Sequence, residues 1–330
     1  MSGKTITNLV HTTNLPWPFA EDQEQFQYTV NVEPARVTKK TAAGEWGANI
    51  VDLGGDEYLH IMTERRRILE ADPSRVQILP GMMPACWDLL MYYLRDLSVS
   101  HPDVMHLEEN GDVIRWRNDL LRTDQVFAIG DEQSLPYDPM TFLGREIPDD
   151  LLLVKERGGQ LYFDAGLVTF AAAWSVTFDV GMSFREIHGP VPRLTGEGIT
   201  SRAEQFLMRL PADRVYRRVN WTLSASGSRK LDISLEELPE WGKDIPRLVA
   251  DRDFGKLQLR IELEHFIRLP MSGAVTFSIR TFMASLEEIK AIPAWRDQLA
   301  QILAATPEDI ATYKGIIDYR DEAIRWLRSS

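Results

Sequence analysis

The sequence predicts an α+β fold built on an antiparallel sheet. Short β-rich runs, separated by glycines and charged residues, fill most of the second half of the chain, and independent helix-start signals mark its C-terminus. We expect one large domain over residues 1–330. It comprises a helical and irregular part (1–150), a sheet core (151–285) and C-terminal helices (286–330).

The N-terminal part should begin as an arm and continue into helices. The prolines of Pro16-Trp17-Pro18-Phe19 each remove a backbone donor, so we expect aromatic side chains to pack this arm. Residues 28–32 alternate like a strand, and residues 56–71 carry apolar side chains at helical spacing. We interpret Glu64-Arg65-Arg66-Arg67 as a solvated face of that helix. Pro84 opens a second helix that continues through Leu97.

The middle of the chain should form the sheet. Residues 101–147 are mixed and rich in turns, with a tight turn at Glu109-Asn110-Gly111-Asp112. Residues 200–210 are a helix candidate. The six predicted strands are 151–154, 160–163, 167–170, 215–223, 257–266 and 274–281.

Two signals predict the C-terminal helices. Ser285-x-x-Glu288 is a capping box, and Thr306-Pro307-Glu308-Asp309 supplies an N-cap, a proline at the first helical position and early acidic residues. The apolar residues that follow should form one packing stripe: Ile310, Tyr313, Ile317, Ile324 and Leu327.

Composition limits the classes of partner. The chain has 37 basic and 49 acidic residues, a formal net charge of −12 and no Lys/Arg-rich run, which argues against binding to nucleic acid. No stretch approaches the roughly 20 apolar residues that span a bilayer, so we expect a soluble, cytoplasmic protein without a membrane partner. The single cysteine, Cys86, excludes an internal disulfide and a four-cysteine cluster, and we interpret it as a buried structural residue.

The usual catalytic motifs are absent from the sequence. There is no G-x-S-x-G elbow, Walker loop, G-x-G-x-x-G after a strand or His-Glu-x-x-His run. One histidine nevertheless has unusual neighbours, because Ile187-His188-Gly189-Pro190-Val191-Pro192 sets an imidazole beside a glycine and two prolines. Such a turn could present the ring rigidly to a heme iron, although a lone histidine is more often a structural residue.

A longer series of motifs resembles the heme-dependent oxidative N-demethylase family, whose heme-binding alpha subunit belongs to dimethylamine monooxygenase. The matches occur in the same order as in the family and cover roughly residues 170–320. They are Trp174, Gly181, Ile187-His188-x-Pro190-Val191-Pro192, Arg218-x-Asn220-Trp221, Arg260-x-Glu262, Arg268-Leu269-Pro270, Ser272-Gly273-Ala274, Ile279-Arg280-Thr281 and Tyr313-Lys314-Gly315. The chain departs from the family pattern at Leu263-Glu264-His265.

The resemblance implies a PAS-like fold that binds heme b, with His188 as the proximal iron ligand. It implies oxidative N-demethylation of a small secondary amine such as dimethylamine, with dioxygen as the oxidant and NADPH as the electron source. It also implies partner subunits: a reductase subunit that carries FMN and an iron-sulfur cluster, and a subunit that binds tetrahydrofolate.

Several further residues are candidates for the site. Arg280 and Arg218 could stabilise reduced oxygen, although either could be a surface arginine on a strand. Glu262 could pair with the ammonium group of the amine, with Trp221 and Tyr216 as aromatic neighbours. We also expect Trp221 to contact the cofactor.

Two more candidates are polar, and each has a structural alternative. Asn220 could donate a hydrogen bond to oxygen or substrate, or it could equally cap a strand. Arg268 could bind a heme propionate, or it could form a structural ion pair.

Two other functions remain open at this stage. A PAS-like heme pocket could sense gas or redox state without turnover, although no output domain is visible in the sequence. The chain could also bind a small ligand or act structurally without heme. Turnover of dimethylamine would distinguish the enzyme from the sensor, and a Soret band would exclude the heme-free protein.

Overall fold

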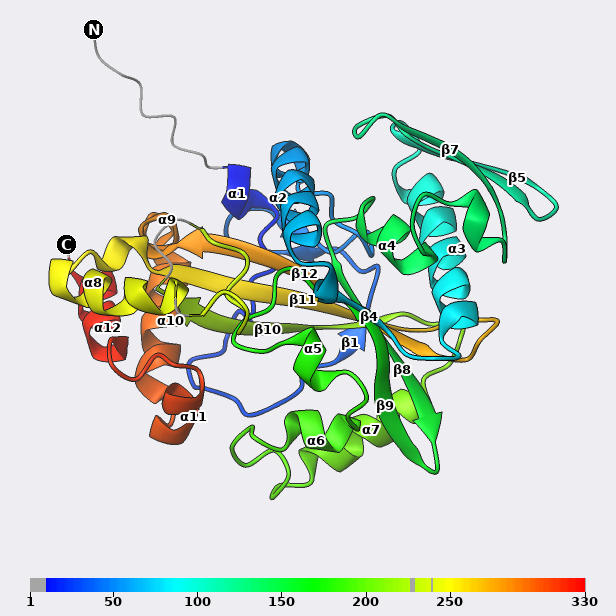
Figure 1. Ribbon diagram of the computed structural model, residues 1–330. Helices are drawn as coiled ribbons and strands as arrows, with labels where there is room; N and C mark the ends of the chain where they lie inside the picture. The colour runs from blue at the N-terminus through cyan, green and yellow to red at the C-terminus, as the bar shows by residue number, and fades with distance from the viewer. Residues whose placement is uncertain (1–9, 226–228, 239, 330) are drawn as a thin grey trace, which may run out of the picture.

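A seven-stranded antiparallel sheet forms the centre of the described part of the molecule (Figure 1). The computed structural model describes residues 10–225, 229–238 and 240–329. The strand order is β1-β10-β11-β12-β8-β9-β4. The bounds are β1 (Glu33–Pro34), β4 (Val76–Ile78), β8 (Asp150–Arg157), β9 (Gln160–Leu167), β10 (Tyr216–Ser224), β11 (Gln258–Arg268) and β12 (Val275–Ser285). The predicted mixed class with an antiparallel sheet is confirmed.

Helices cover the sheet on both faces and at one end (Figure 1). One face packs against α2 (Tyr58–Ala71), α3 (Met83–Ser100) and α4 (Pro139–Gly144), and the other against α5 (Val176–Asp179), α6 (Phe184–His188) and α7 (Ile199–Met208). The helices at the end are α8 (Asp244–Asp251), α9 (Leu286–Lys290), α10 (Pro293–Ala305), α11 (Glu308–Tyr313) and α12 (Arg320–Arg328).

The remaining elements lie outside the large sheet. They are α1 (Val10–Thr13), the strand pair β2 (Lys39–Lys40) and β3 (Glu45–Trp46), and a three-stranded sheet of β5 (Met105–Asn110), β6 (Val113–Asn118) and β7 (Thr123–Ala128). The predicted turn after residue 109 is confirmed, because Gly111 has a positive φ of 61° between β5 and β6. None of the described helices is both long and apolar enough to cross a membrane.

Residues alternate between the two faces of the sheet, and this alternation places the candidate residues on different faces. The face toward α6, called here the α6 face, carries Arg218 and Asn220 of β10 beside Glu264 and Glu262 of β11. The opposite face, called the α3 face, carries Trp221, His265 and Arg280.

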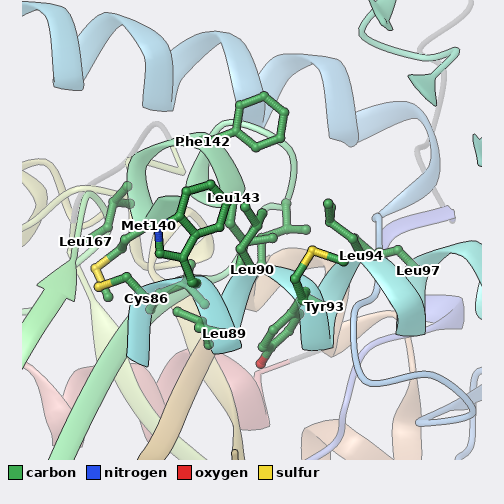
Figure 2. Close-up of a cluster of buried hydrophobic side chains, with 14 of the residues drawn as sticks. Cys86, Leu89, Leu90, Tyr93, Leu94, Leu97, Met140, Phe142, Leu143 and Leu167 are labelled. Carbon is green, nitrogen blue, oxygen red and sulfur yellow. The ribbon is translucent and has the colours of Figure 1, made fainter. Parts of the chain in front are cut away.

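The core under the α3 face is apolar and closely packed. Figure 2 shows side chains of α3 packing against α4, with Cys86 among them. Cys86 is fully buried, and burial raises the pKa of its thiol to about 12. The interpretation of Cys86 as a buried structural residue is confirmed, because such a thiol stays protonated and unreactive.

The N-terminal arm packs as predicted. Trp17 stacks on Trp295 with ring centroids 4.4 Å apart, and Phe19 meets Trp221 edge-on at 5.2 Å. The predicted strand at 28–32 is wrong, because those residues are irregular and Asn31 adopts a left-handed φ of 38°. The ladder begins only at β1, where Glu33 pairs with Arg217.

Three other predictions need correction. Residues 167–170 form no further strand, because Leu167 ends β9 and the chain turns away. Arg65 is not part of a solvated face, since its side chain is fully buried and donates to Asp150 at 2.7 Å. The C-terminal stripe is interrupted at Gly315, whose φ is 66°, between α11 and α12.

The helix-start signals behave differently from one another. The capping box predicted at Ser285 and Glu288 is confirmed at the start of α9. Thr306 is not the N-cap of α11, because its hydroxyl donates back to Ile302 and it ends α10 instead.

Candidate functional site

His188 is the last residue of α6, a short helix fixed at its start by a capping box between Ser183 and Glu186. Its Nδ1 lies 2.7 Å from the carbonyl oxygen of Phe184. A carbonyl can only accept, so Nδ1 carries the proton and Nε2 keeps its lone pair. The ring also packs on the Phe184 ring, with centroids 4.1 Å apart.

Burial and the positive charge of Arg218 both lower the pKa of His188, and burial is the larger cause. The hydrogen bond to Phe184 opposes this shift. A lowered pKa favours the neutral imidazole, which is the form that binds a metal. The helix end therefore presents an oriented, neutral ring with Nε2 available.

The turn after His188 is tied to distant parts of the chain. Tyr28 of the N-terminal arm donates its hydroxyl hydrogen to the carbonyl of Pro192. Arg193 has a φ of 64° and forms a two-point ion pair with Asp309 of α11, with both bonds at 2.7 Å. A surface hollow of about 620 Å³ is lined by Arg193, Glu308, Asp309 and Thr312. The turn that carries His188 is thus held against α11.

A row of polar side chains lies on the α6 face across β10 and β11. Arg218 pairs in register with Glu264, and their charged groups are 3.8 Å apart. Asn220 pairs with Glu262 and donates to its carboxylate at 3.1 Å. The side chains of Arg218, Glu264 and Glu262 remain 24%, 13% and 17% exposed, although they stand on inner strands. The row is therefore reachable from solvent.

Lys314, just after α11, closes the row at the edge of β10. Its Nζ donates to the carbonyl of Trp221 at 2.5 Å, and its own carbonyl accepts from Thr222 at 3.4 Å. Burial lowers the pKa of Lys314 to about 8, with Glu262 opposing the shift and Arg218 adding to it. The charges of Glu262 and Arg218 both act on Lys314, so Lys314 belongs to the same electrostatic cluster as the row.

Arg280 and Trp221 lie on the α3 face. Arg280 is 1% exposed and donates to the carbonyls of Asp52 and Thr281 at 3.1 and 2.7 Å. Its Nη2 has no hydrogen-bond partner among the described residues. Trp221 packs with the N-terminal arm, and the Nζ of Lys314 lies 5.0 Å from the centroid of its ring. The sheet itself separates both residues from Arg218, Asn220 and Glu262.

The guanidinium of Arg268 is hydrogen-bonded to backbone carbonyls. Its Nε and Nη2 donate to the carbonyls of Leu207, Met208 and Leu210 at the end of α7, at 2.6–2.8 Å, and its Nη1 donates to Gly273 at 2.7 Å. Positive charge at a helix C-terminus stabilises the helix. The structure therefore places Arg268 in a capping role, with its donors already used.

Tyr216 lies on the α6 face, with its ring edge-on to Phe206 of α7 at 5.2 Å. Sequence reasoning missed Glu264 and Lys314 as members of the polar row. The signal for Glu264 was available, because residues two apart on a strand share a face and Glu264 follows Glu262. Lys314 belongs to the matched segment Tyr313-Lys314-Gly315, but that match does not indicate its place in the row, which depends on how α11 docks.

The family model described as "Haem-dependent oxidative N-demethylase, alpha subunit-like" matches residues 47–324, which is most of the chain.

Proposed function

The chain belongs to the haem-dependent oxidative N-demethylase, alpha subunit-like family, and on that premise we propose that it removes a methyl group oxidatively from a small secondary amine such as dimethylamine. The family description indicates an oxidoreductase that depends on heme. In the proposed reaction dioxygen is the oxidant, and the electrons come from NADPH through partner subunits.

The observation that carries the proposal is that the His188 ring is oriented by a hydrogen bond and favours its neutral form. Its Nδ1 proton is donated to the Phe184 carbonyl at 2.7 Å, so the Nε2 lone pair would be available to hold a heme iron. The glycine and prolines after it add little bulk on that side. The residues present therefore fit a histidine-ligated heme, and we propose His188 as its proximal ligand.

The surroundings of His188 also suit a flat apolar group. Partly buried hydrophobic side chains border the same face: Leu152, Trp174, Ile187, Tyr216 and Phe277. When bound, heme b would supply the iron that activates dioxygen for oxidation of the N-methyl group. The chain itself would hold the macrocycle and the amine.

Glu262 and Asn220 are the proposed amine-binding residues. A secondary amine is cationic at neutral pH and favours a carboxylate partner. The Glu262 carboxylate is oriented by Asn220 at 3.1 Å and by Arg260 at 3.1 Å, and it remains partly exposed. It would pair with the ammonium group, and the Asn220 amide would fix its direction. Arg280 and Trp221 have no part in this proposal because they lie on the other face.

Electron supply would come from other subunits. One cysteine in 330 residues cannot hold a four-cysteine cluster, and the family description is that of an alpha subunit. We propose a partner that carries FMN and an iron-sulfur cluster, and a second that accepts the one-carbon unit on tetrahydrofolate. We further propose that the chain is one PAS-like heme-binding domain that works in the cytoplasm.

The test is an absorption spectrum of the protein reconstituted with hemin. His188→Ala should lose the Soret band or shift it strongly, whereas His106→Ala on β5, paired with Asp119, should keep the wild-type spectrum. Dimethylamine should perturb the wild-type spectrum. An unchanged spectrum in His188→Ala would reject the ligand. Formaldehyde release from dimethylamine with a reductase present would support the enzyme over a gas or redox sensor.

A further inference from the structure

We propose that Arg218 and Lys314 form a carboxylate-binding site beside His188, which takes either a heme propionate or the carboxylate of an N-methylated amino acid. The inference rests on the proposed function, because it concerns the same face of the sheet. It replaces Arg268 as the partner of a carboxylate there, since the donors of Arg268 already bind backbone carbonyls.

The first argument is the balance of charge on the α6 face. Arg260 is already committed, since it donates to Glu262 at 3.1 Å and to the carbonyl of Leu231 at 2.7 Å. Glu262 thus already has one cationic partner, and it is also the carboxylate proposed above for the amine. Glu264 has only the loose contact with Arg218 at 3.8 Å, and burial raises its pKa, which favours its neutral form. The positive charges of Arg218 and Lys314 therefore exceed the negative charge available to them.

The second argument is an unused donor. The Nε of Arg218 is buried and has no hydrogen-bond partner in the described part of the chain, although the side chain as a whole is 24% exposed. Buried donors in folded proteins nearly always have an acceptor, from the protein, from water or from a ligand. A guanidinium with free N–H groups next to an open surface is suited to a carboxylate, which can accept two parallel bonds.

The third argument is the position of Lys314. Its Nζ donates one hydrogen bond to the carbonyl of Trp221, which leaves two N–H groups for another acceptor. The carbonyl of Lys314 is anchored by Thr222, so the side chain lies over the part of β10 that follows Arg218. Thr222 follows Arg218 by four residues on β10, so their Cα atoms are about 13 Å apart, and the long side chains of Arg218 and Lys314 can address two neighbouring carboxylate groups or one that lies between them.

The repulsion between these two cations supports the same conclusion. Arg218 lowers the pKa of both Lys314 and His188, although burial is the larger cause in each case. Like charges that are held close together are unfavourable unless an anion lies between them. A bound carboxylate would relieve this repulsion and satisfy the Nε of Arg218 at once.

The experiment compares hemin with hemin dimethyl ester, in which both propionates are blocked, by titrating the heme-free protein and following the Soret band. If a propionate occupies the site, the wild type should bind hemin about tenfold or more tightly than the ester, as expected for charge-assisted hydrogen bonds. Arg218→Gln and Lys314→Gln should each reduce this preference. Arg268→Gln should leave the ratio unchanged, because its guanidinium serves α7.

A second arm tests the other source of the carboxylate. If the wild type binds hemin and its ester equally, the hemin-loaded protein is titrated with N-methylglycine and with dimethylamine. A preference for N-methylglycine that Arg218→Gln and Lys314→Gln both abolish would assign the site to the substrate. If neither arm shows a preference for the carboxylate, this inference is wrong but the proposed function is not affected. Absence of any Soret band in the wild type overturns the proposed function and this inference together. Two variants from different elements, each checked by circular dichroism, guard against misfolding of one of them.

Discussion

The two faces of the large sheet are built from the same strands, yet they differ in solvent access and in the use of polar residues. On the α6 face, Arg218, Glu262 and Glu264 keep 13–24% of their side-chain surface exposed and form loose or shared contacts. On the α3 face, His265 and Arg280 are 0–1% exposed. Within residues 10–225, 229–238 and 240–329, both ring nitrogens of His265 and the Nη2 of Arg280 have no hydrogen-bond partner.

The difference follows from what covers each face. Long helices α2 and α3 and the N-terminal arm seal the α3 face, whereas the short helices α5 to α7 lie over the β8–β9 end of the other (Figure 1). A sealed face can hold polar groups only if protein or internal water satisfies them. Polar residues on the open face can exchange partners, which a binding site requires. We therefore assign ligand binding to the part of the α6 face where Arg218, Glu262 and Glu264 stay exposed, and stability to the sealed parts of the sheet, which include the fully buried Arg260 of the same face.

The largest effect should come from breaking the buried ion pair between α2 and the start of β8. Arg65 and Asp150 are 0% and 2% exposed and lie 2.7 Å apart, and Arg65 also donates to Ile147, Pro148 and Thr169. Arg65→Met leaves the Asp150 carboxylate buried without its cation and should lower the free energy of unfolding by about 3–5 kcal/mol. Urea denaturation measures this change.

The matched control for that prediction is two residues away on the same helix. Arg67 is 57% exposed and pairs with Glu64 at 2.7 Å. Exposed pairs contribute about 0–1 kcal/mol, so Arg67→Met should change stability little. Equal effects of the two substitutions would contradict the contrast between a sealed interior and a solvated surface.

A smaller effect should appear as a pH dependence of stability. Burial raises the pKa of Asp149 from 3.8 to about 7, against the opposing effect of Arg280 and Arg65. The protonated Asp149 carboxyl therefore contributes stability that is complete at pH values below its unfolded-state pKa. This contribution is lost as the pH rises through its folded-state pKa. As the pH rises from about 4 to about 7, the wild type should therefore lose stability and Asp149→Asn should lose less. Urea unfolding at several pH values across that range measures the difference. Parallel curves would show that Asp149 does not titrate in this window.

The contrast between the faces also explains what the sequence could predict. Local signals were sufficient for the strand runs of β10, β11 and β12 and for the capping box of α9, because each depends on neighbours in the chain. Arg65 was misinterpreted since its charge run resembles a surface, and its burial is tolerable because Asp150 and the carbonyls that follow α4 accept its hydrogen bonds. Arg280 and Arg218 looked equivalent because a motif does not state which face a residue occupies. Lys314 was missed because docking of α11 is a tertiary event.

The smallest effect should come from Cys86→Ala. This substitution tests whether the α3 side of the molecule takes part in heme binding. The Cys86 thiol is fully buried between α3 and α4, and its pKa is raised to about 12 by burial (Figure 2). Cys86→Ala removes one buried atom and should lower stability by about 1 kcal/mol, similar to other small core deletions. The Soret band of the hemin-loaded variant should keep its wild-type position, in contrast to His188→Ala. A shifted band in Cys86→Ala would mean that the α3 side takes part in heme binding, and the division of roles between the two faces would then be wrong.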